Sequence, residues 1–277
     1  MNFPKTIWMY WHQGFDEAPE IIQHCVKQWQ LLHPKWTIHL LDKKNVDSYI
    51  DSLPLAKLKL DELTLAHRSD LIRTKLLILH GGVWADPTCF PLIPLEEWLY
   101  KNMESGLFLF YKPGRDRIIS NWFIASERGN PLLKKLLIEL CHYWENNTFI
   151  NRGQRKIWYE TWIKKIYNRS LWSTKLWFTW FTQKVLKLYP YMVYHYKFYE
   201  LISKDSQSNT YWQKMSKISA LGPHKLQRAG LLAPLLNETK EIIDNKEYPL
   251  FKLSWKIKDA IWRMDSVLGY LFKQPHE

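Results

Sequence analysis

The 277-residue sequence contains only three cysteines, Cys25, Cys89 and Cys141. Their number is odd, and their wide spacing matches neither a disulfide framework nor a metal-binding motif. So few cysteines are typical of a protein in a reducing compartment, where they fill the core as small apolar side chains.

Long hydrophobic runs are missing as well. No apolar stretch approaches the roughly 18 to 20 residues that span a bilayer, and residues 1–11 do not have the pattern of a signal peptide. We therefore expect a cytoplasmic protein, peripheral on the cytoplasmic face of the inner membrane. The net charge is +12, but no recognised nucleic-acid-binding motif accompanies it, so nucleic acid is not an expected partner.

Acidic residues are nearly absent from one segment. Residues 151–197 hold ten Lys and Arg, thirteen aromatic residues and a single acid, Glu160. One interpretation is a helical platform that binds anionic lipid headgroups while Trp and Phe enter the membrane boundary. The other is that these aromatics build an acceptor cleft and a second core. We favour the membrane interpretation, because a core does not require the loss of nearly all acids.

The hydrophobic pattern predicts an α/β fold. Strands are expected at residues 6–11, 36–41, 83–85, 107–111 and 121–126, and helices at 21–32, 58–80 and 131–143. A β-α-β order within the first forty residues indicates an open, mainly parallel sheet. We divide the chain into an α/β core (1–150), a mainly helical, aromatic-rich basic insertion (151–210) and a C-terminal part (211–277).

The stretch from Ala66 to Thr88 carries the chemistry. Asp70 and Arg73 lie three residues apart on a helix that is apolar around most of its circumference, so a buried pair is expected. A short strand after that helix delivers Asp86 at its carboxyl end, where open α/β sheets bind ligands. An ordinary surface ion pair is the alternative. We expect the three side chains to converge on one polyhydroxylated ligand.

Three motifs, FPKTIWMYWHQG, SDLIRTKLLILHGGVWADPT and ISALGPHKLQ, occur in this order. They resemble the capsular polysaccharide synthesis family of bacterial glycosyltransferases, which is related to glycosyltransferase family 32 and, more remotely, to the clostridial glucosylating toxins. The resemblance covers most of residues 3–150 and returns at 217–256. It implies a GT-A (Rossmann-like) fold, a nucleotide-sugar donor, probable retention at the anomeric carbon and, through the toxins, a uridine diphosphate sugar.

The resemblance also implies roles for individual residues. Trp11 matches the tryptophan that stacks on the nucleobase, and Asp70 and Arg73 match the pair that binds the donor sugar. The catalytic residues implied are Asp70, Arg73, Asp86 and His224. The substrate-binding residues are Trp11, Gly14, Ser69, Asp70, Arg73, Gly81, Gly82, Thr88, Asn121, Gly222 and Lys225, although Asn121 is equally well explained as a turn residue at a strand end.

The sequence departs from the acidic motif of related transferases. Those enzymes have Asp-x-Asp, where this chain has Asp86-Pro87-Thr88 and so lacks the second acid. Mn²⁺ and Mg²⁺ prefer carboxylate oxygens. Asp86, Thr88 and His224 could hold a divalent cation together with the diphosphate. Alternatively, basic side chains such as Lys225 or Arg228 balance the diphosphate charge.

The expected function is sugar transfer from a nucleotide diphosphate sugar to a glycan or lipid-linked acceptor, in the synthesis of bacterial capsule or lipopolysaccharide. Two alternatives remain open. One is a sugar-phosphate transferase that acts on the same glycans. The other is a catalytically inactive, membrane-peripheral subunit, which the missing second acid suggests.

Overall fold

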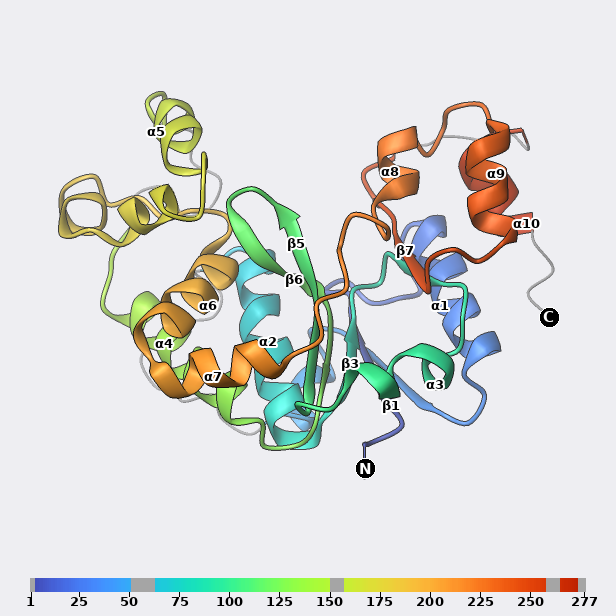
Figure 1. Cartoon of the computed structure of the whole chain (residues 1–277), viewed down its shortest axis with the longest axis horizontal. Helices are drawn as coiled ribbons and strands as arrows, with labels where there is room; N and C mark the ends of the chain where they lie inside the picture. The colour runs from blue at the N-terminus through green and yellow to red at the C-terminus, as the bar shows by residue number, and fades with distance from the viewer. Residues whose placement is uncertain (1–2, 51–62, 150–156, 258–264, 274–277) are drawn as a thin grey trace.

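A computed structural model describes residues 3–50, 63–149, 157–257 and 265–273 of the chain. Strands and helices alternate in the first half, and short helices dominate the second (Figure 1). The strands are β1 (Thr6–Tyr10), β2 (Thr37–Leu41), β3 (Gly82–Ala85), β4 (Cys89–Pro91), β5 (Leu107–Gly114), β6 (Arg117–Ser126) and β7 (Leu250–Lys252). The α-helices are α1 (Glu20–Leu32), α2 (Leu65–His80), α3 (Leu95–Trp98), α4 (Pro131–Glu145), α5 (Glu160–Tyr167), α6 (Val193–Lys204), α7 (Ser206–Lys214), α8 (Lys225–Ala229), α9 (Asn237–Asp244) and α10 (Val267–Lys273).

The central sheet has five strands in the order β2-β1-β3-β6-β5. β1 pairs in parallel with β2 and β3, whereas β6 pairs antiparallel with β3 and with β5. The expected open sheet is therefore present, and its parallel half is the β-α-β unit that the sequence predicted. β5 and β6 are antiparallel because only two residues join them, and a connection that short can only form a hairpin.

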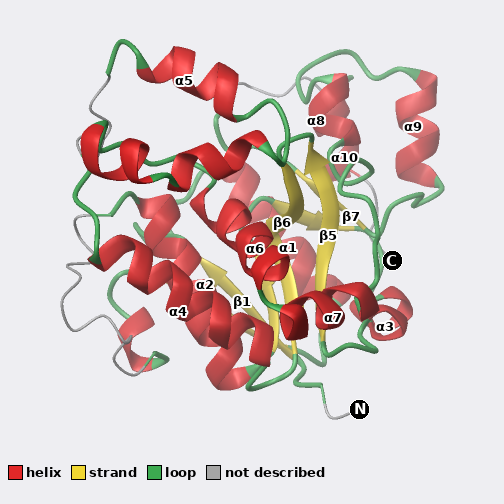
Figure 2. Cartoon of the chain, turned by 60° about the vertical axis from the view of Figure 1, so that its left-hand side comes forward, coloured by secondary structure: helices red, strands yellow, loops and turns green. Residues whose placement is uncertain are grey.

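Side chains alternate between the two faces of this sheet, as strand geometry requires. Ile7 and Met9 of β1 join one hydrophobic cluster with α1 and α3, and Trp8 and Tyr10 join a second cluster with α2, α4 and α6. Figures 1 and 2 show these helices on both faces of the sheet. The α/β class is confirmed.

The helix expected at residues 58–80 begins later. Thr64 caps α2 through its side chain, which accepts from the backbone N–H of His67, so the helix starts at Leu65. Residues 58–62 lie outside the described part of the chain. The predicted end is confirmed, since α2 stops at His80 before Gly81 with φ 68°.

The C-terminal region returns to the sheet-centred core. β7 pairs antiparallel with β4, which follows β3 closely in the chain, and Ser219 forms a bridge with Tyr111 of β5. These contacts bring residues near 220 and 252 beside the carboxyl end of β3.

The basic segment forms short helices. α5 is followed by η5 (Ser173–Phe178), and η6 (Phe181–Val185) is a π-helix. Two further 3₁₀-helices lie in the described residues, η1 (Val46–Ser48) and η3 (Tyr100–Asn102). Among the described residues, no helix is long and apolar enough to cross a membrane. The three-part division of the chain stays a prediction.

Candidate functional site

A cavity of about 1070 Å³ opens at the carboxyl ends of β1 and β3. Trp11 directly follows β1 and Asp86 directly follows β3, and both line this cavity. Because α2 runs back to the start of β3, the first turns of α2 lie at the same edge of the sheet and supply Ser69, Asp70 and Arg73 to the cavity wall. This is the edge at which open α/β sheets bind ligands.

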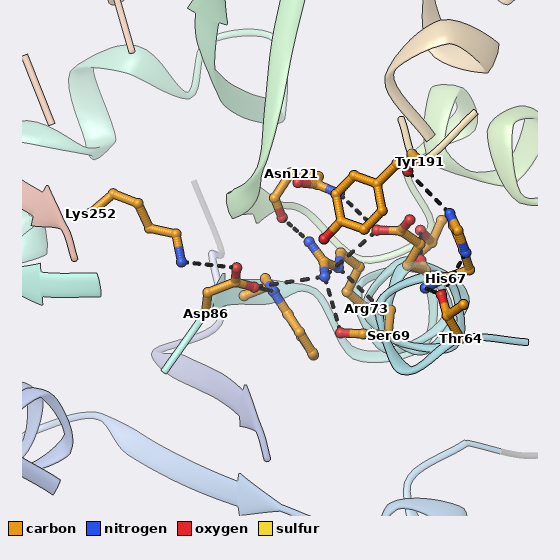
Figure 3. Close-up of polar contacts among 11 residues, drawn as sticks. Thr64, His67, Ser69, Arg73, Asp86, Asn121, Tyr191 and Lys252 are labelled. Carbon is orange, nitrogen blue, oxygen red and sulfur yellow. Dashed lines mark hydrogen bonds and ion pairs between the residues drawn. The ribbon is translucent and has the colours of Figure 1, made fainter. Parts of the chain in front are cut away.

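Arg73 joins the two carboxylates of the site (Figure 3). Its Nη2 lies 3.6 Å from Asp70 Oδ1 and 3.7 Å from Asp86 Oδ1. The guanidinium also lies 4.9 Å from the centroid of the Trp84 ring and donates from Nη2 to Ser69 Oγ at 3.0 Å. The predicted proximity of these three side chains is therefore confirmed, and the surface ion pair alternative is wrong because Asp70 and Arg73 are buried. A carbohydrate bound between them stays a prediction.

Asn121 completes this group from the opposite side of the cavity. Its Nδ2 donates to Asp70 Oδ1 at 2.7 Å, and its backbone carbonyl accepts from Arg73 Nη1. Asn121 lies within β6 and not at a strand end, so the turn explanation is wrong. The amide fixes the carboxylate of Asp70 while the carbonyl fixes the guanidinium of Arg73.

The two carboxylates have opposite pKa shifts. Burial raises the pKa of Asp70 to about 7, and Arg73 and Asn121 offset only part of that rise. Burial would also raise the pKa of Asp86, but Lys252 first and Arg73 second outweigh it, so the pKa of Asp86 lies below its ordinary value. With a pKa near 7, Asp70 can be protonated and donate to a sugar hydroxyl, whereas the charged Asp86 can only accept.

Other predicted residues line the same cavity. Trp11 packs edge-on against Trp255, with ring centroids 5.6 Å apart. Trp11 is partly exposed and lines the cavity wall. Thr88 lies two residues beyond Asp86, and His224 packs against Trp122 at 5.6 Å and bonds Gln227 through Nδ1 at 3.0 Å. Burial lowers the pKa of His224, which favours the neutral imidazole.

Five predicted substrate-binding residues do not line the cavity: Gly14, Gly81, Gly82, Gly222 and Lys225. Gly81 and Gly82 lie at the other end of α2, where a Cβ on Gly82 would approach the Thr6 carbonyl oxygen to 2.6 Å, so these glycines serve close backbone packing. A Cβ on Gly222 would meet the Tyr248 ring at 2.2 Å. Lys225 Nζ lies 3.7 Å from Glu238. Their predicted substrate contacts stay without support from the structure.

Two residues of the site were missed by the sequence analysis. Lys252 Nζ lies 3.2 Å from Asp86 Oδ2 (Figure 3). It also donates to Thr88 Oγ1. His195 of α6 lines the cavity, and its buried Nδ1 has no hydrogen-bond partner among the described residues. No signal in the sequence marked either residue, since Lys252 lies 166 residues from Asp86.

The basic segment also reaches the cavity. Glu160, Lys164 and Tyr191 line it, and the backbone carbonyl of Tyr191 bonds His67 Nε2 at 3.1 Å. Burial lowers the pKa of His67 to about 4, so its ring is neutral and structural near pH 7. The cleft interpretation of this segment therefore has structural support, and the membrane interpretation stays a prediction.

The predicted metal ligands fit a divalent cation poorly. Lys252 already bonds the two oxygen-bearing side chains, Asp86 and Thr88. No group of three His, Cys, Asp or Glu side chains in the described part of the chain could hold a metal ion. A single carboxylate is a small share of the six or more oxygens that Mg²⁺ or Ca²⁺ takes.

The chain is similar in sequence to several known proteins. A family model described as "Capsular polysaccharide synthesis protein" matches residues 1–152, which include β1, α2 and Asp86. The O-glycosyltransferase braB of Annulohypoxylon truncatum is 32% identical over 163 residues, covering 52% of this chain and 38% of the relative. The initiation-specific alpha-1,6-mannosyltransferase of Candida albicans is 26% identical over 166 residues, covering 50% of this chain and 42% of the relative.

The chain thus spans well under half of the length of these curated relatives. Among solved structures, the PaToxG glycosyltransferase aligns over 86% of this chain and 82% of its own, at 16% identity and a TM-score of 0.40. That score is too low for an argument from shared architecture.

Proposed function

Since the chain belongs to the capsular polysaccharide synthesis protein family, we propose that it transfers a sugar from a nucleotide diphosphate sugar to a glycan or lipid-linked acceptor. The observation that carries the proposal is the cluster of buried Asp70 and Arg73 with partly buried Asp86, on the wall of one large cavity at the strand ends. The relatives named as glycosyltransferases support the same reaction class.

The reaction exchanges one C–O bond for another. The bond between the anomeric carbon and the diphosphate breaks, and its electron pair leaves with the diphosphate oxygen. The acceptor hydroxyl forms the new bond to the anomeric carbon and releases its proton, so the products are the glycoside, a nucleoside diphosphate and a proton. The protein must stabilise negative charge on the diphosphate and hold the sugar in place.

The residues divide between these two tasks. Asp70 and Arg73, braced by Asn121, bind hydroxyls of the donor sugar. Asp86 accepts from the ribose side of the donor, and the neutral His224 ring faces the diphosphate. Trp11, beside Trp255, offers an aromatic surface to the nucleobase.

The finer features of the reaction are taken from the family resemblance. We propose a uridine diphosphate sugar, retention at the anomeric carbon, and a role in bacterial capsule or lipopolysaccharide synthesis. In retention, the acceptor attacks from the face that the diphosphate leaves.

The proposal is tested by incubating the purified chain with a panel of nucleotide sugars and an extract of bacterial surface glycans. We expect release of a nucleoside diphosphate that requires both donor and acceptor. Release of a nucleoside monophosphate would instead identify a sugar-phosphate transferase. No consumption of any donor would identify an inactive subunit and would contradict the proposal.

We also propose that the chain works while bound peripherally to the cytoplasmic face of the inner membrane. The basic segment exposes Trp158 by 84%, Trp172 by 71% and Trp180 by 71%, an unusual set of large apolar side chains on one stretch of chain. In Figure 1 α5 lies at the periphery of the molecule, away from the central sheet. Exposed tryptophans among lysines suit the boundary of an anionic membrane.

Sedimentation with vesicles tests this location. The chain should sediment with phosphatidylglycerol vesicles at low salt and much less with phosphatidylcholine vesicles, because the lysines require anionic headgroups. Failure to sediment with either at low ionic strength would contradict the membrane proposal and leave the proposed reaction intact.

A further inference from the structure

Lys252 is held in place by backbone contacts on both of its sides. It is the last residue of β7, where it pairs with Cys89 of β4. Its backbone N–H donates to the carbonyl of Pro223 at 2.8 Å, and the next N–H along the chain, from Leu253, donates to the carbonyl of Thr88 at 2.8 Å. The lysine is thereby fixed between the Asp86–Thr88 turn and the loop before α8.

The ammonium group of Lys252 lies where a metal ion would need to bind. Nζ is 3.2 Å from Asp86 Oδ2 and also donates to Thr88 Oγ1. These two oxygens are the remaining oxygen ligands of the Asp86-Pro87-Thr88 motif. Lys252 and Arg73 approach Asp86 on opposite sides (Figure 3), so each carboxylate oxygen already faces one cation.

A divalent cation would meet two obstacles at this place. It would compete with the ammonium for Asp86 Oδ2 and Thr88 Oγ1, and it would lie beside two positive groups that share one carboxylate. The side chain of Lys252 is only 15% exposed, so water screens this repulsion weakly.

The ammonium also has capacity for a ligand. It carries three N–H donors, and two of them serve Asp86 and Thr88. Lys252 lines the cavity, and among the described residues no third acceptor bonds its Nζ. One donor with a full positive charge is therefore available to an anionic group in the cavity.

We propose that Lys252 replaces the divalent cation of related transferases and binds the departing diphosphate of the donor directly. The inference rests on the proposed function. When the anomeric C–O bond breaks, the charge that develops on the diphosphate oxygen is stabilised by the Lys252 ammonium, so transfer proceeds without Mn²⁺ or Mg²⁺.

The first experiment uses the wild-type chain. Binding of the common nucleoside diphosphates is measured by isothermal titration calorimetry in EDTA and again in MnCl₂. We expect at least one nucleoside diphosphate to bind with the same affinity, within about twofold, in both. Binding of Mn²⁺ alone is followed by its electron paramagnetic resonance signal, and no Asp86-dependent site is expected.

The second experiment removes the charge. Lys252→Met keeps the length of the side chain and should weaken nucleoside diphosphate binding about 10- to 100-fold, the effect of losing one charge-assisted hydrogen bond. Lys27→Met is the matched control, because Lys27 is exposed on α1 and does not line the cavity. Thermal unfolding of both variants checks that they fold.

The outcomes separate this inference from the proposed function. Nucleoside diphosphate binding that requires Mn²⁺, or a folded Lys252→Met variant that binds like the wild type, overturns the role of Lys252 and leaves the glycosyltransferase proposal standing. If no nucleoside diphosphate binds in either solution, both are overturned. If Lys252→Met does not fold, the affinity of the wild-type chain for nucleoside diphosphates in EDTA and in MnCl₂ still tests whether binding requires the metal.

Discussion

The sheet-centred region and the basic segment use tryptophan in opposite ways. In the first region Trp29 and Trp84 are completely buried, and Trp84 supports the site by contacting Arg73 and donating to Asp86 Oδ1 at 3.0 Å. In the second region Trp158, Trp162 and Trp172 are 84%, 66% and 71% exposed. The same residue type therefore fixes a charged site in one region and leaves a large apolar surface in the other.

The difference follows from the local structure of each region. A strand alternates its side chains between two faces, and helices cover both faces of this sheet, so the large side chains of its strands pack on both faces. The basic segment forms an eight-residue helix, a six-residue 3₁₀-helix and a five-residue π-helix. These short elements bury only a small cluster around Trp177, Leu188 and Tyr196.

The largest contrast is expected in stability. Trp29→Ala should lower the free energy of unfolding by about 3–5 kcal/mol, because it removes a fully buried ring and a 2.8 Å hydrogen bond to the Cys89 carbonyl. Trp172→Ala should change it by less than about 0.5 kcal/mol. Urea denaturation measures both. Equal losses would mean that Trp172 is buried against a part of the protein or a partner in solution.

The next contrast concerns two acids that line the same cavity. Asp86→Asn should lower turnover of the donor about 100- to 1000-fold, because it removes the charge that holds Arg73 and Lys252 together. Glu160→Gln, in the basic segment, should lower turnover less than about tenfold. Steady-state release of nucleoside diphosphate compares them. Full activity of Asp86→Asn would contradict the assignment of this cavity as the active site.

The third prediction concerns pH and belongs to the sheet-centred region. The raised pKa of Asp70 means that the folded chain binds a proton between about pH 4 and 7 that the unfolded chain has lost. The contribution of Asp70 to the free energy of unfolding therefore falls as pH rises through that window, by at most about 1.4 kcal/mol per pH unit. Above about pH 7 this contribution no longer changes with pH. The lowered pKa of Asp86 has the opposite effect. Asp86 contributes to the free energy of unfolding near neutral pH, and this contribution is lost as pH falls below the ordinary carboxyl range.

Asp70→Asn isolates this effect. The difference in unfolding free energy between wild type and variant, measured by urea denaturation from pH 4 to 8, should change steadily up to about pH 7 and then level off. A difference that is independent of pH would show that Asp70 is ionised throughout.

The smallest expected effect is on membrane binding. Replacing Trp172 and Trp180 by serine should weaken binding to phosphatidylglycerol vesicles about tenfold, through the loss of apolar area. Ile138→Ser is the control, since Ile138 is 61% exposed on α4, outside the basic segment. If the control weakens binding as much as the double variant, the vesicle contact lies elsewhere.

Much of the sheet-centred region could be predicted from the sequence, because its signals are local. Short runs of β-branched and large apolar residues marked β1 and β2, Gly81 marked the end of α2, and the spacing of Asp70 and Arg73 placed them on one helix face. Asp86 followed from its place at a strand end. These residues lie within one β-α-β arrangement whose geometry is well constrained.

The parts that were missed depend on contacts between distant segments. β7 has three residues and its pairing with β4 spans about 160 positions, so nothing local indicated that Lys252 meets Asp86. The glycine pair was assigned to the ligand, although its positive φ angles serve a turn at the far end of α2. Local sequence does not distinguish a glycine needed for packing from one needed for a ligand.

A crystal structure of the chain with its nucleotide sugar tests the central claim most directly. We predict the sugar within hydrogen-bonding distance of Asp70 and Arg73, and the diphosphate in contact with the Lys252 ammonium in the same cavity. Donor density outside this cavity, or a sugar that contacts neither Asp70 nor Arg73, would contradict the account.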